Sequence, residues 1–113
     1  MQYHEIVPLD KAAAGELLLS GDEEKIVMGL LGLVEGNTEW RWVQDQCLRF
    51  VNDPRVTVAR VAIMCLGHLA RMEGKLDLDK VMPVLDDCMQ HENPAIRGVT
   101  EDTLSDISIY IKD

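Results

Sequence analysis

The sequence contains few aromatic residues: two Trp, two Tyr and one Phe among 113 residues. Aliphatic side chains must therefore fill most of the interior, which favours packed helices over a sheet sandwich. The four prolines and eight glycines fall mostly at the ends of patterned segments. No useful length of chain alternates apolar and polar residues with a period of two, which is the pattern of a half-buried strand. The predicted fold class is all-α.

The sequence also has no long hydrophobic run. Its longest apolar stretch, residues 26–34, is interrupted by Gly29 and Gly32 and falls short of the roughly 20 residues that cross a bilayer. The N-terminal residues MQYHEIVPLDK lack a basic segment followed by an apolar one, so no secretory signal is predicted. We expect a cytoplasmic protein that does not associate with a membrane.

The residues that usually bind metals are few and scattered. The three cysteines and three histidines form no CxxC motif and no pair of histidines at ligand spacing: Cys47, Cys65, Cys88, His4, His68 and His91. Each cysteine lies among apolar residues at a predicted core position. The sequence therefore predicts three buried free thiols, which suits a reducing compartment, and no metal site.

No catalytic motif is present in the sequence. There is no glycine-rich phosphate loop and no nucleophile elbow. Gly29 and Gly32 lie within an apolar segment, where they indicate close packing between helices. We therefore nominate no catalytic or cofactor-binding residue and do not expect an enzyme.

The most informative stretch runs from residue 53 to residue 72. Asp53 and Pro54 are predicted to begin a helix, with Asp53 as its cap and Pro54 in its first turn. Apolar or small residues then recur with the i, i+4, i+8, i+11 spacing of a buried helix face: Val58, Ala62, Leu66 and Leu69. This segment is predicted to be the central helix, which ends at Gly74.

Five other segments show similar helical patterns. Pro8 is predicted to begin the first, Asp22 and Thr38 to cap the next two, and Pro94 to open the last. Pro83 lies inside the fifth, where it either shifts the start to about residue 80 or bends the helix. The predicted helices are 8–20, 22–35, 39–51, 54–73, 77–90 and 94–111.

Two of these helices repeat one pattern. The positions of the central stripe recur in the last helix at a constant offset of 38 residues: Ile96, Thr100, Leu104 and Ile107. Both helices follow an Asx-Pro turn, and the helix at 22–35 repeats the plan less closely. Self-similarity of this kind predicts stacked helical hairpins, because one hairpin cannot bury its apolar face alone.

The repeated segments resemble HEAT repeats. The matching residues are Asn93-Pro94-Ala95-Ile96-Arg97 in the last hairpin, and Val58, Ala62 and Leu66-Gly67 in the middle one. The resemblance implies a single domain over residues 1–113, built as a right-handed α-solenoid of three stacked antiparallel hairpins and about six helices. The hairpins would span about 8–36, 38–74 and 76–111.

The chain is acidic, with 20 acidic and 11 basic residues and a formal net charge of −9. Acidic residues concentrate in residues 1–38 and 74–113, while residues 39–73 are nearly neutral. Such a charge repels nucleic acid and anionic membranes and attracts a basic protein partner. The alternative is that the acidity only keeps the protein soluble.

Two features are candidate partner contacts. We use the term acidic ridge for Glu101, Asp102 and Asp106. Asp102 and Asp106 are like charges at i, i+4 in mid-helix, and such a pair destabilises a helix by a few tenths of a kcal/mol. The ridge either binds a basic partner or is only a solvated face. Trp40 is the second candidate, as a partly exposed anchor, whereas Trp42 lies on the apolar stripe and is predicted to be in the core.

Two functions remain open at this point. The first is an immunity or antitoxin-type inhibitor that occludes a basic, nuclease-like toxin; the chain is similar to small acidic immunity proteins in its general character. The second is a HEAT-like scaffold or adaptor subunit that binds a peptide or a larger complex through a concave helix face. The oligomeric state is not indicated by either reading.

Overall fold

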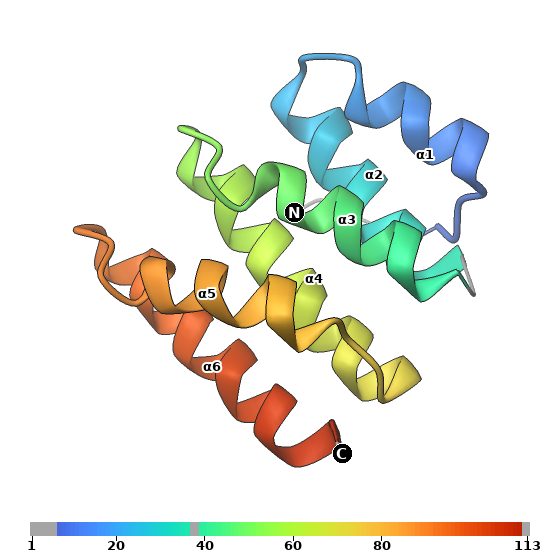
Figure 1. The fold of residues 1–113 in the computed structure, drawn as a ribbon. Helices are drawn as coiled ribbons and strands as arrows, with labels where there is room; N and C mark the ends of the chain where they lie inside the picture. Colours follow the sequence, from blue (N-terminus) through green and yellow to red (C-terminus); the bar gives the residue numbers. More distant parts are fainter. Residues whose placement is uncertain (1–6, 37–38, 112–113) are drawn as a thin grey trace.

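A computed structural model describes residues 7–36 and 39–111 of the chain (Figure 1). The described residues form six α-helices and no strand, so the all-α prediction is confirmed. The helices are α1 (Lys11–Leu18), α2 (Glu23–Gly36), α3 (Trp40–Phe50), α4 (Val56–Glu73), α5 (Leu78–Cys88) and α6 (Pro94–Tyr110).

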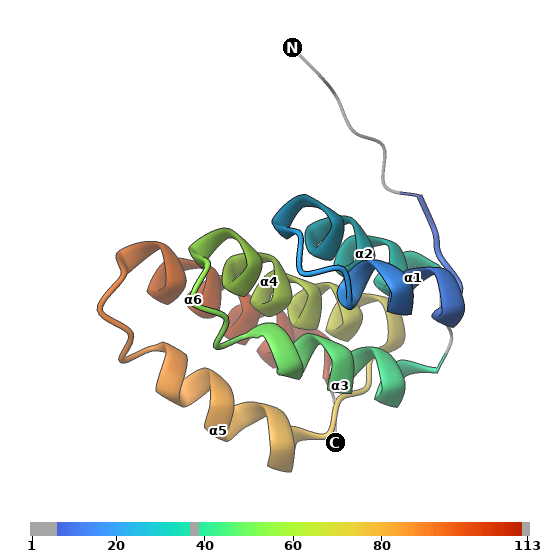
Figure 2. The ribbon, with the colours of Figure 1, turned by 90° about the horizontal axis from the view of Figure 1, so that it is seen from above.

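The helices form two layers of three. Helices α2, α4 and α6 lie side by side with α4 in the middle, and α1, α3 and α5 form the other layer (Figures 1 and 2). α4 packs against α2, α3 and α6, which makes it the central helix of the molecule. Consecutive helices pair as antiparallel hairpins, as the sequence predicts. In the described residues, no helix is long and apolar enough to cross a membrane.

The core is one continuous cluster to which all six helices contribute. The four stripe positions of α4 are at most 1% exposed: Val58, Ala62, Leu66 and Leu69. Their counterparts in α6 are also buried, except Leu104, which is half-buried. The pattern offset by 38 residues thus marks the core-facing sides of two neighbouring helices.

α1 begins later than the sequence pattern predicts. The Oδ1 atom of Asp10 accepts a hydrogen bond from the backbone N–H of Ala13 at 2.8 Å, so Asp10 caps the helix and Lys11 is its first residue. Pro8 therefore precedes the helix instead of opening it. The prediction was wrong here because a proline before a capping aspartate carries no helical signal of its own.

α4 also begins later than predicted, at Val56. Asp53 does not cap it, because its Oδ1 accepts from the backbone N–H and from Nε of Arg55, both at 2.9 Å. A second guanidinium nitrogen of Arg55 donates to the carbonyl oxygen of Gly21 at 3.1 Å. Asp53 therefore stabilises the turn that carries Arg55, and Arg55 ties this turn to the turn between α1 and α2.

Other predicted helix ends are confirmed. Asp22 accepts from the backbone N–H of Lys25 at 3.0 Å, and Asn93 caps α6 by accepting from the N–H of Ala95 at 2.8 Å. α4 ends at Glu73, and the next residue, Gly74, has a φ of 65° in the left-handed region that favours glycine. The predicted cap Thr38 lies outside the described residues.

α5 keeps Pro83 inside the helix and begins at Leu78 rather than near residue 80. Pro83 lies within the second turn, so it removes a single intrahelical N–H donor. Asp77 precedes the helix, and its backbone carbonyl accepts from the N–H groups of Lys80 and Val81, both at 3.0 Å. The helix ends at Cys88, two residues earlier than predicted.

The three cysteines are free and buried, as predicted. A hydrogen bond to the thiol of Cys65, together with burial, raises the pKa of Cys47 well above its usual value. Burial, with a smaller effect from the neighbouring charge of Asp87, raises the pKa of Cys88. The described residues contain no group of three His, Cys, Asp or Glu side chains placed to hold a metal ion.

Candidate partner-binding surface

The acidic ridge lies on α6 but its three members have different surroundings. Glu101 and Asp102 are exposed, whereas Asp106 is half-buried. A carboxylate oxygen of Asp106 lies 3.9 Å from Nε of Arg71 on α4. Glu101 and Asp102 differ by about 100° around the helix, so Glu101 points to another side of α6 than Asp102 and Asp106.

A glycine on α4 makes room for Asp106. A Cβ on Gly67 would lie 2.9 Å from Oδ2 of Asp106 and 3.3 Å from Oγ1 of Thr103. The buried hydroxyl of Thr103 donates to the backbone carbonyl of Ile63 at 3.0 Å, which fixes α6 against α4 at this level. Asp106 is thus held in the seam between the two helices, and its charge has a structural partner.

A chain of polar contacts continues from this seam across α4 to α2. A guanidinium nitrogen of Arg71 lies 2.9 Å from Nδ1 of His68, and Nε2 of His68 lies 3.1 Å from a carboxylate oxygen of Glu35. Arginine can only donate, so Nδ1 of His68 accepts and Nε2 carries the proton that is donated to Glu35. We call these four residues the cross-helix chain: Glu35, His68, Arg71 and Asp106.

A cavity of about 260 Å³ opens between α2 and α4 beside the cross-helix chain. Its apolar lining comes from both helices: Leu31, Val34, Met64 and Cys65. Three members of the cross-helix chain form its polar edge: Glu35, His68 and Arg71. Arg71 lines the cavity and also contacts Asp106, so the cavity and Asp106 are parts of one surface, from which Glu101 points away. We call this surface the α2–α4–α6 face.

Trp40 is not part of this face. It is the first residue of α3, in the other layer of helices, and the structure does not bring it to the acidic ridge. Its ring is half-buried against the core, and the guanidinium carbon of Arg41 lies 4.4 Å from the ring centroid. Trp42, predicted to be in the core, is also only half-buried, with Nζ of Lys11 5.2 Å from its ring centroid.

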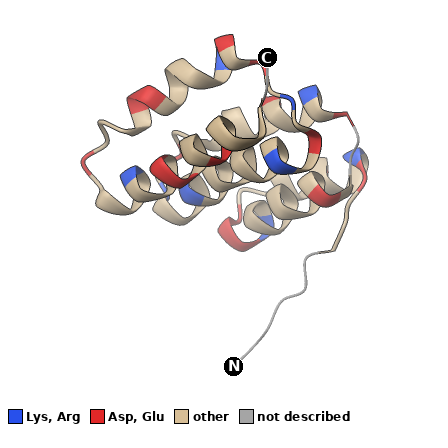
Figure 3. Cartoon of the chain, turned by 90° about the horizontal axis from the view of Figure 1, so that it is seen from below, with Lys and Arg blue, Asp and Glu red and all other residues tan. Residues whose placement is uncertain are grey.

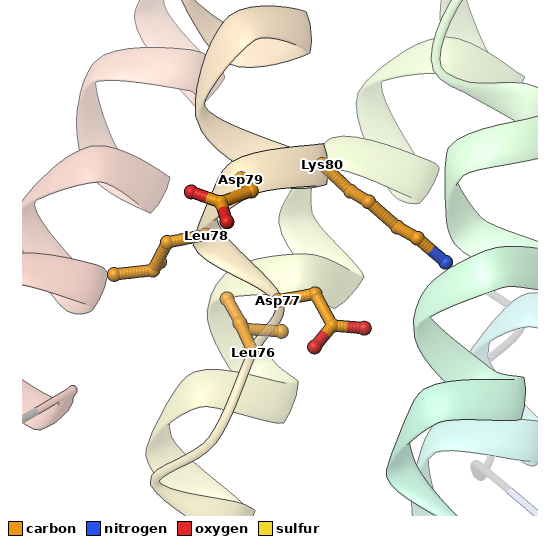
Figure 4. A pocket seen from close by; sticks show the side chains of 5 residues that line it. All are labelled: Leu76, Asp77, Leu78, Asp79 and Lys80. Carbon is orange, nitrogen blue, oxygen red and sulfur yellow. The ribbon is translucent and has the colours of Figure 1, made fainter.

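A second, more polar cleft of about 440 Å³ lies at the start of α5 (Figure 4). It is lined by residues 76–80, and in Figure 4 the side chains of Asp77 and Lys80 point toward α3. Oδ2 of Asp77 lies 3.5 Å from Nε of Arg41, and Nζ of Lys80 lies 3.7 Å from Oδ1 of Asp45. Asp77 and Lys80 thus have partners on α3.

Three residues of the α2–α4–α6 face were not predicted from the sequence: Glu35, His68 and Arg71. His68 and Arg71 are three residues apart and lie off the apolar stripe of α4, which places both on its outer side. Glu35 joins them only because α2 packs beside α4. Acidic and basic residues are both visible on the side of the molecule shown in Figure 3.

Comparison with known proteins identifies a fold but no family. No family model matches the sequence, and no curated protein matches it. The structure is similar to a chain in the crystal structure of a CDI complex from Cupriavidus taiwanensis LMG 19424. The TM-score is 0.84, the sequence identity is 24%, and the similarity covers 99% of this chain and 99% of the other. The two chains therefore share one fold from end to end.

Proposed function

We propose that the protein is an immunity-type inhibitor that binds a toxin and occludes its active site. The observation that carries the proposal is the end-to-end similarity to a chain of a CDI (contact-dependent inhibition) complex. The match leaves only about 1% of either chain outside the shared fold. A chain of the same size and fold therefore occurs in a complex of a toxin system, which is consistent with a toxin-binding role for this one.

The charge of the chain indicates the chemistry of the partner. A net charge of −9 favours a basic protein, and a nuclease-like toxin is basic where it holds phosphates. Asp102 is exposed on α6 beside the half-buried Asp106, so an acidic group is available on the α2–α4–α6 face. Such a group steers association and increases the on-rate more than it increases affinity. Trp40 remains a second candidate contact on the other layer.

We assign no catalysis, cofactor or metal to the protein. An inhibitor of this kind acts by stoichiometric occlusion, so it needs a complementary surface rather than reactive groups. We place the protein in the cytoplasm, where it would meet an incoming nuclease-like toxin.

The direct test uses the protein encoded by the reading frame immediately upstream. We expect its expression alone to stop growth, co-expression of this chain to restore growth, and the two purified proteins to form a stable 1:1 complex. Growth arrest that this chain does not relieve, or the absence of a complex, would contradict the proposal.

The contribution of the acidic ridge is tested with Asp102→Asn, because Asp106→Asn would also remove the partner of Arg71. Asp86→Asn is the matched control: Asp86 is exposed on α5 and the substitution changes the net charge equally. We expect Asp102→Asn to lower the on-rate more than the control does. The difference should shrink above about 0.15 M salt, where the Debye length is about 8 Å. Equal on-rates for the two variants would exclude Asp102 from the interface.

A scaffold or adaptor role is the second candidate, because three stacked helical pairs can present a continuous surface to a peptide. The same experiments separate the two functions. A scaffold forms complexes without relieving toxicity, whereas an inhibitor abolishes the activity of its partner at equimolar concentration.

A further inference from the structure

The cavity between α2 and α4 has the size of a site for a side chain. Ligand pockets for small molecules usually measure about 300–1,000 Å³, and this cavity is smaller, at about 260 Å³. Four of its seven lining residues are apolar: Leu31, Val34, Met64 and Cys65. An apolar side chain of another protein would lose its contact with water there and gain contact with both helices.

Met64 is the most accessible apolar residue of the lining. The residue is 42% exposed, although it lies on the central helix, which packs between α2 and α6. Met72 on the same helix is 44% exposed but does not line the cavity. Methionine adapts its shape to a partner because it is unbranched and polarizable. The chain thus offers a pair of methionines with equal exposure, only one of which belongs to the cavity.

The cross-helix chain holds the edge of the cavity in place. The chain connects α2, α4 and α6 through three contacts: 3.1 Å between Glu35 and His68, 2.9 Å between His68 and Arg71, and 3.9 Å between Arg71 and Asp106. Each of these side chains is therefore positioned before any partner binds. A polar edge around an apolar pocket resembles the arrangement at binding hot spots, where surrounding contacts exclude water from a central anchor.

The charges around the cavity determine which residues of a partner are favoured next to an apolar side chain that enters it. Glu35 and Arg71 line its edge on α2 and α4, and Asp106 on α6 contacts Arg71. The exposed Asp102 lies one helical turn before Asp106 on α6. These four groups carry three negative charges and one positive charge, so they favour a cationic segment. Because Arg71 joins the cavity to Asp106, an apolar residue in the cavity would bring its flanking residues close to these carboxylates.

We propose that the cavity on the α2–α4–α6 face is the anchor site for the toxin. The occupant is a bulky apolar side chain of the toxin, flanked by Lys or Arg residues that pair with Glu35 and with Asp102 or Asp106. This inference rests on the proposed inhibitor function and adds to it the anchor position and the local chemistry of the partner.

The first experiment observes the cavity in the unmodified protein. The methionine methyl groups are labelled with ¹³C, and the protein encoded by the upstream reading frame is added as the probe. We expect the Met64 methyl signal to shift or broaden at one equivalent, and the Met72 signal to stay in place. Movement of Met72 without Met64 would exclude the cavity from the interface.

The second experiment compares Met64→Gln with Met72→Gln. Both changes are neutral, similar in length and made at equally exposed positions of α4, so both variants are expected to fold. We expect Met64→Gln to weaken binding of the same probe about tenfold or more, mainly through faster dissociation. Met72→Gln should change the dissociation constant less than about twofold.

The outcomes separate this inference from the proposed function. If the wild type binds the probe and Met64→Gln binds equally well, the anchor site is wrong while the inhibitor function stands. If the wild type does not bind the probe at all, both fail. Equal loss of affinity in the two variants would also overturn the anchor site, because the effect would then not depend on the cavity.

Discussion

Gln44 of α3 and Asp77 before α5 form a reciprocal pair. The backbone N–H of Asp77 donates to Oε1 of Gln44 at 2.7 Å, and Nε2 of Gln44 donates to a carboxylate oxygen of Asp77 at 3.1 Å. Gln44 is fully buried, so the bonds of its amide are shielded from water. The pair attaches the loop between α4 and α5 to α3, and with it the start of α5.

We therefore expect Gln44→Ala to destabilise the fold by about 1–3 kcal/mol, because it leaves the N–H of Asp77 without its acceptor. Gln46→Ala is the control, since within residues 7–36 and 39–111 the side chain of Gln46 accepts a hydrogen bond only from exposed Arg49 on the same helix. It should cost less than about 0.5 kcal/mol. Urea unfolding monitored by circular dichroism measures both, and equal midpoints for the two variants would contradict a structural role for the pair.

Truncation of the central stripe should be more costly. Leu66 is fully buried on α4, and Leu66→Ala should lower the free energy of unfolding by about 2–5 kcal/mol through lost burial and the remaining cavity. A domain of this size has about 5–15 kcal/mol in total, so the melting temperature should fall markedly. Leu19, which is 77% exposed, is the matched control. If Leu66→Ala and Leu19→Ala melt alike, Leu66 is not in the core.

The Asp53–Arg55 pair should make part of the stability depend on pH. The hydrogen bond from Arg55 lowers the pKa of Asp53 below its usual value of 3.8. A carboxyl with a depressed pKa stabilises the fold at pH values above 3.8, and this contribution disappears as the pH falls through the lower pKa of the folded state. Asp53→Asn should therefore be less stable than the wild type at pH 7, and the difference should shrink in acid.

That difference is measured by urea unfolding of both proteins at pH 7 and at about pH 3. The other carboxyl groups are common to both proteins, so their titration largely cancels. Asn can still accept the backbone hydrogen bond from Arg55, which isolates the effect of the charge. A difference in stability that is constant across this range would show that the charge of Asp53 contributes nothing.

The thiols provide a test of the core near α3, α4 and α5. Cys47, Cys65 and Cys88 are at most 3% exposed, and burial raises the pKa of Cys47 and Cys88. All three should react slowly with a thiol reagent in the native protein, because the three thiols are inaccessible and the raised pKa values of Cys47 and Cys88 make their reactive thiolates scarce. Unfolding in guanidinium should release three equivalents at once. Rapid reaction of all three in native buffer would contradict the packing.

Prediction of the helices from the sequence succeeded where one face of a helix is buried. The stripe Val58, Ala62, Leu66 and Leu69 identified α4 and its buried face, because burial repeats every 3.6 residues whatever the neighbour is. Helix starts were less predictable. Asp10 and Asp53 are both short acidic residues before a helix, but the first caps and the second bonds to Arg55. Asp10 directly precedes α1, whereas Arg55 is the residue that directly precedes α4 and Asp53 lies two positions before it.

The candidate site was predicted in part. The sequence pointed to Asp102 and Asp106 on α6, and the structure places both there, with Asp106 bound to Arg71. It also pointed to Trp40, which lies on the other layer. The contact between Glu35 and His68 was not predicted, because the two residues are 33 positions apart and no local pattern links them.

The sequence alone determined the helical class, the antiparallel pairing and the buried stripes, because these follow from periodicity, short connections and the need to bury one face of each helix. Tertiary packing alone decided which charges meet. Placing α4 between α2 and α6 assembles the cross-helix chain and the cavity beside it. Contacts between residues far apart in the chain depend on the order and spacing of the helices in space, which local residue patterns do not encode.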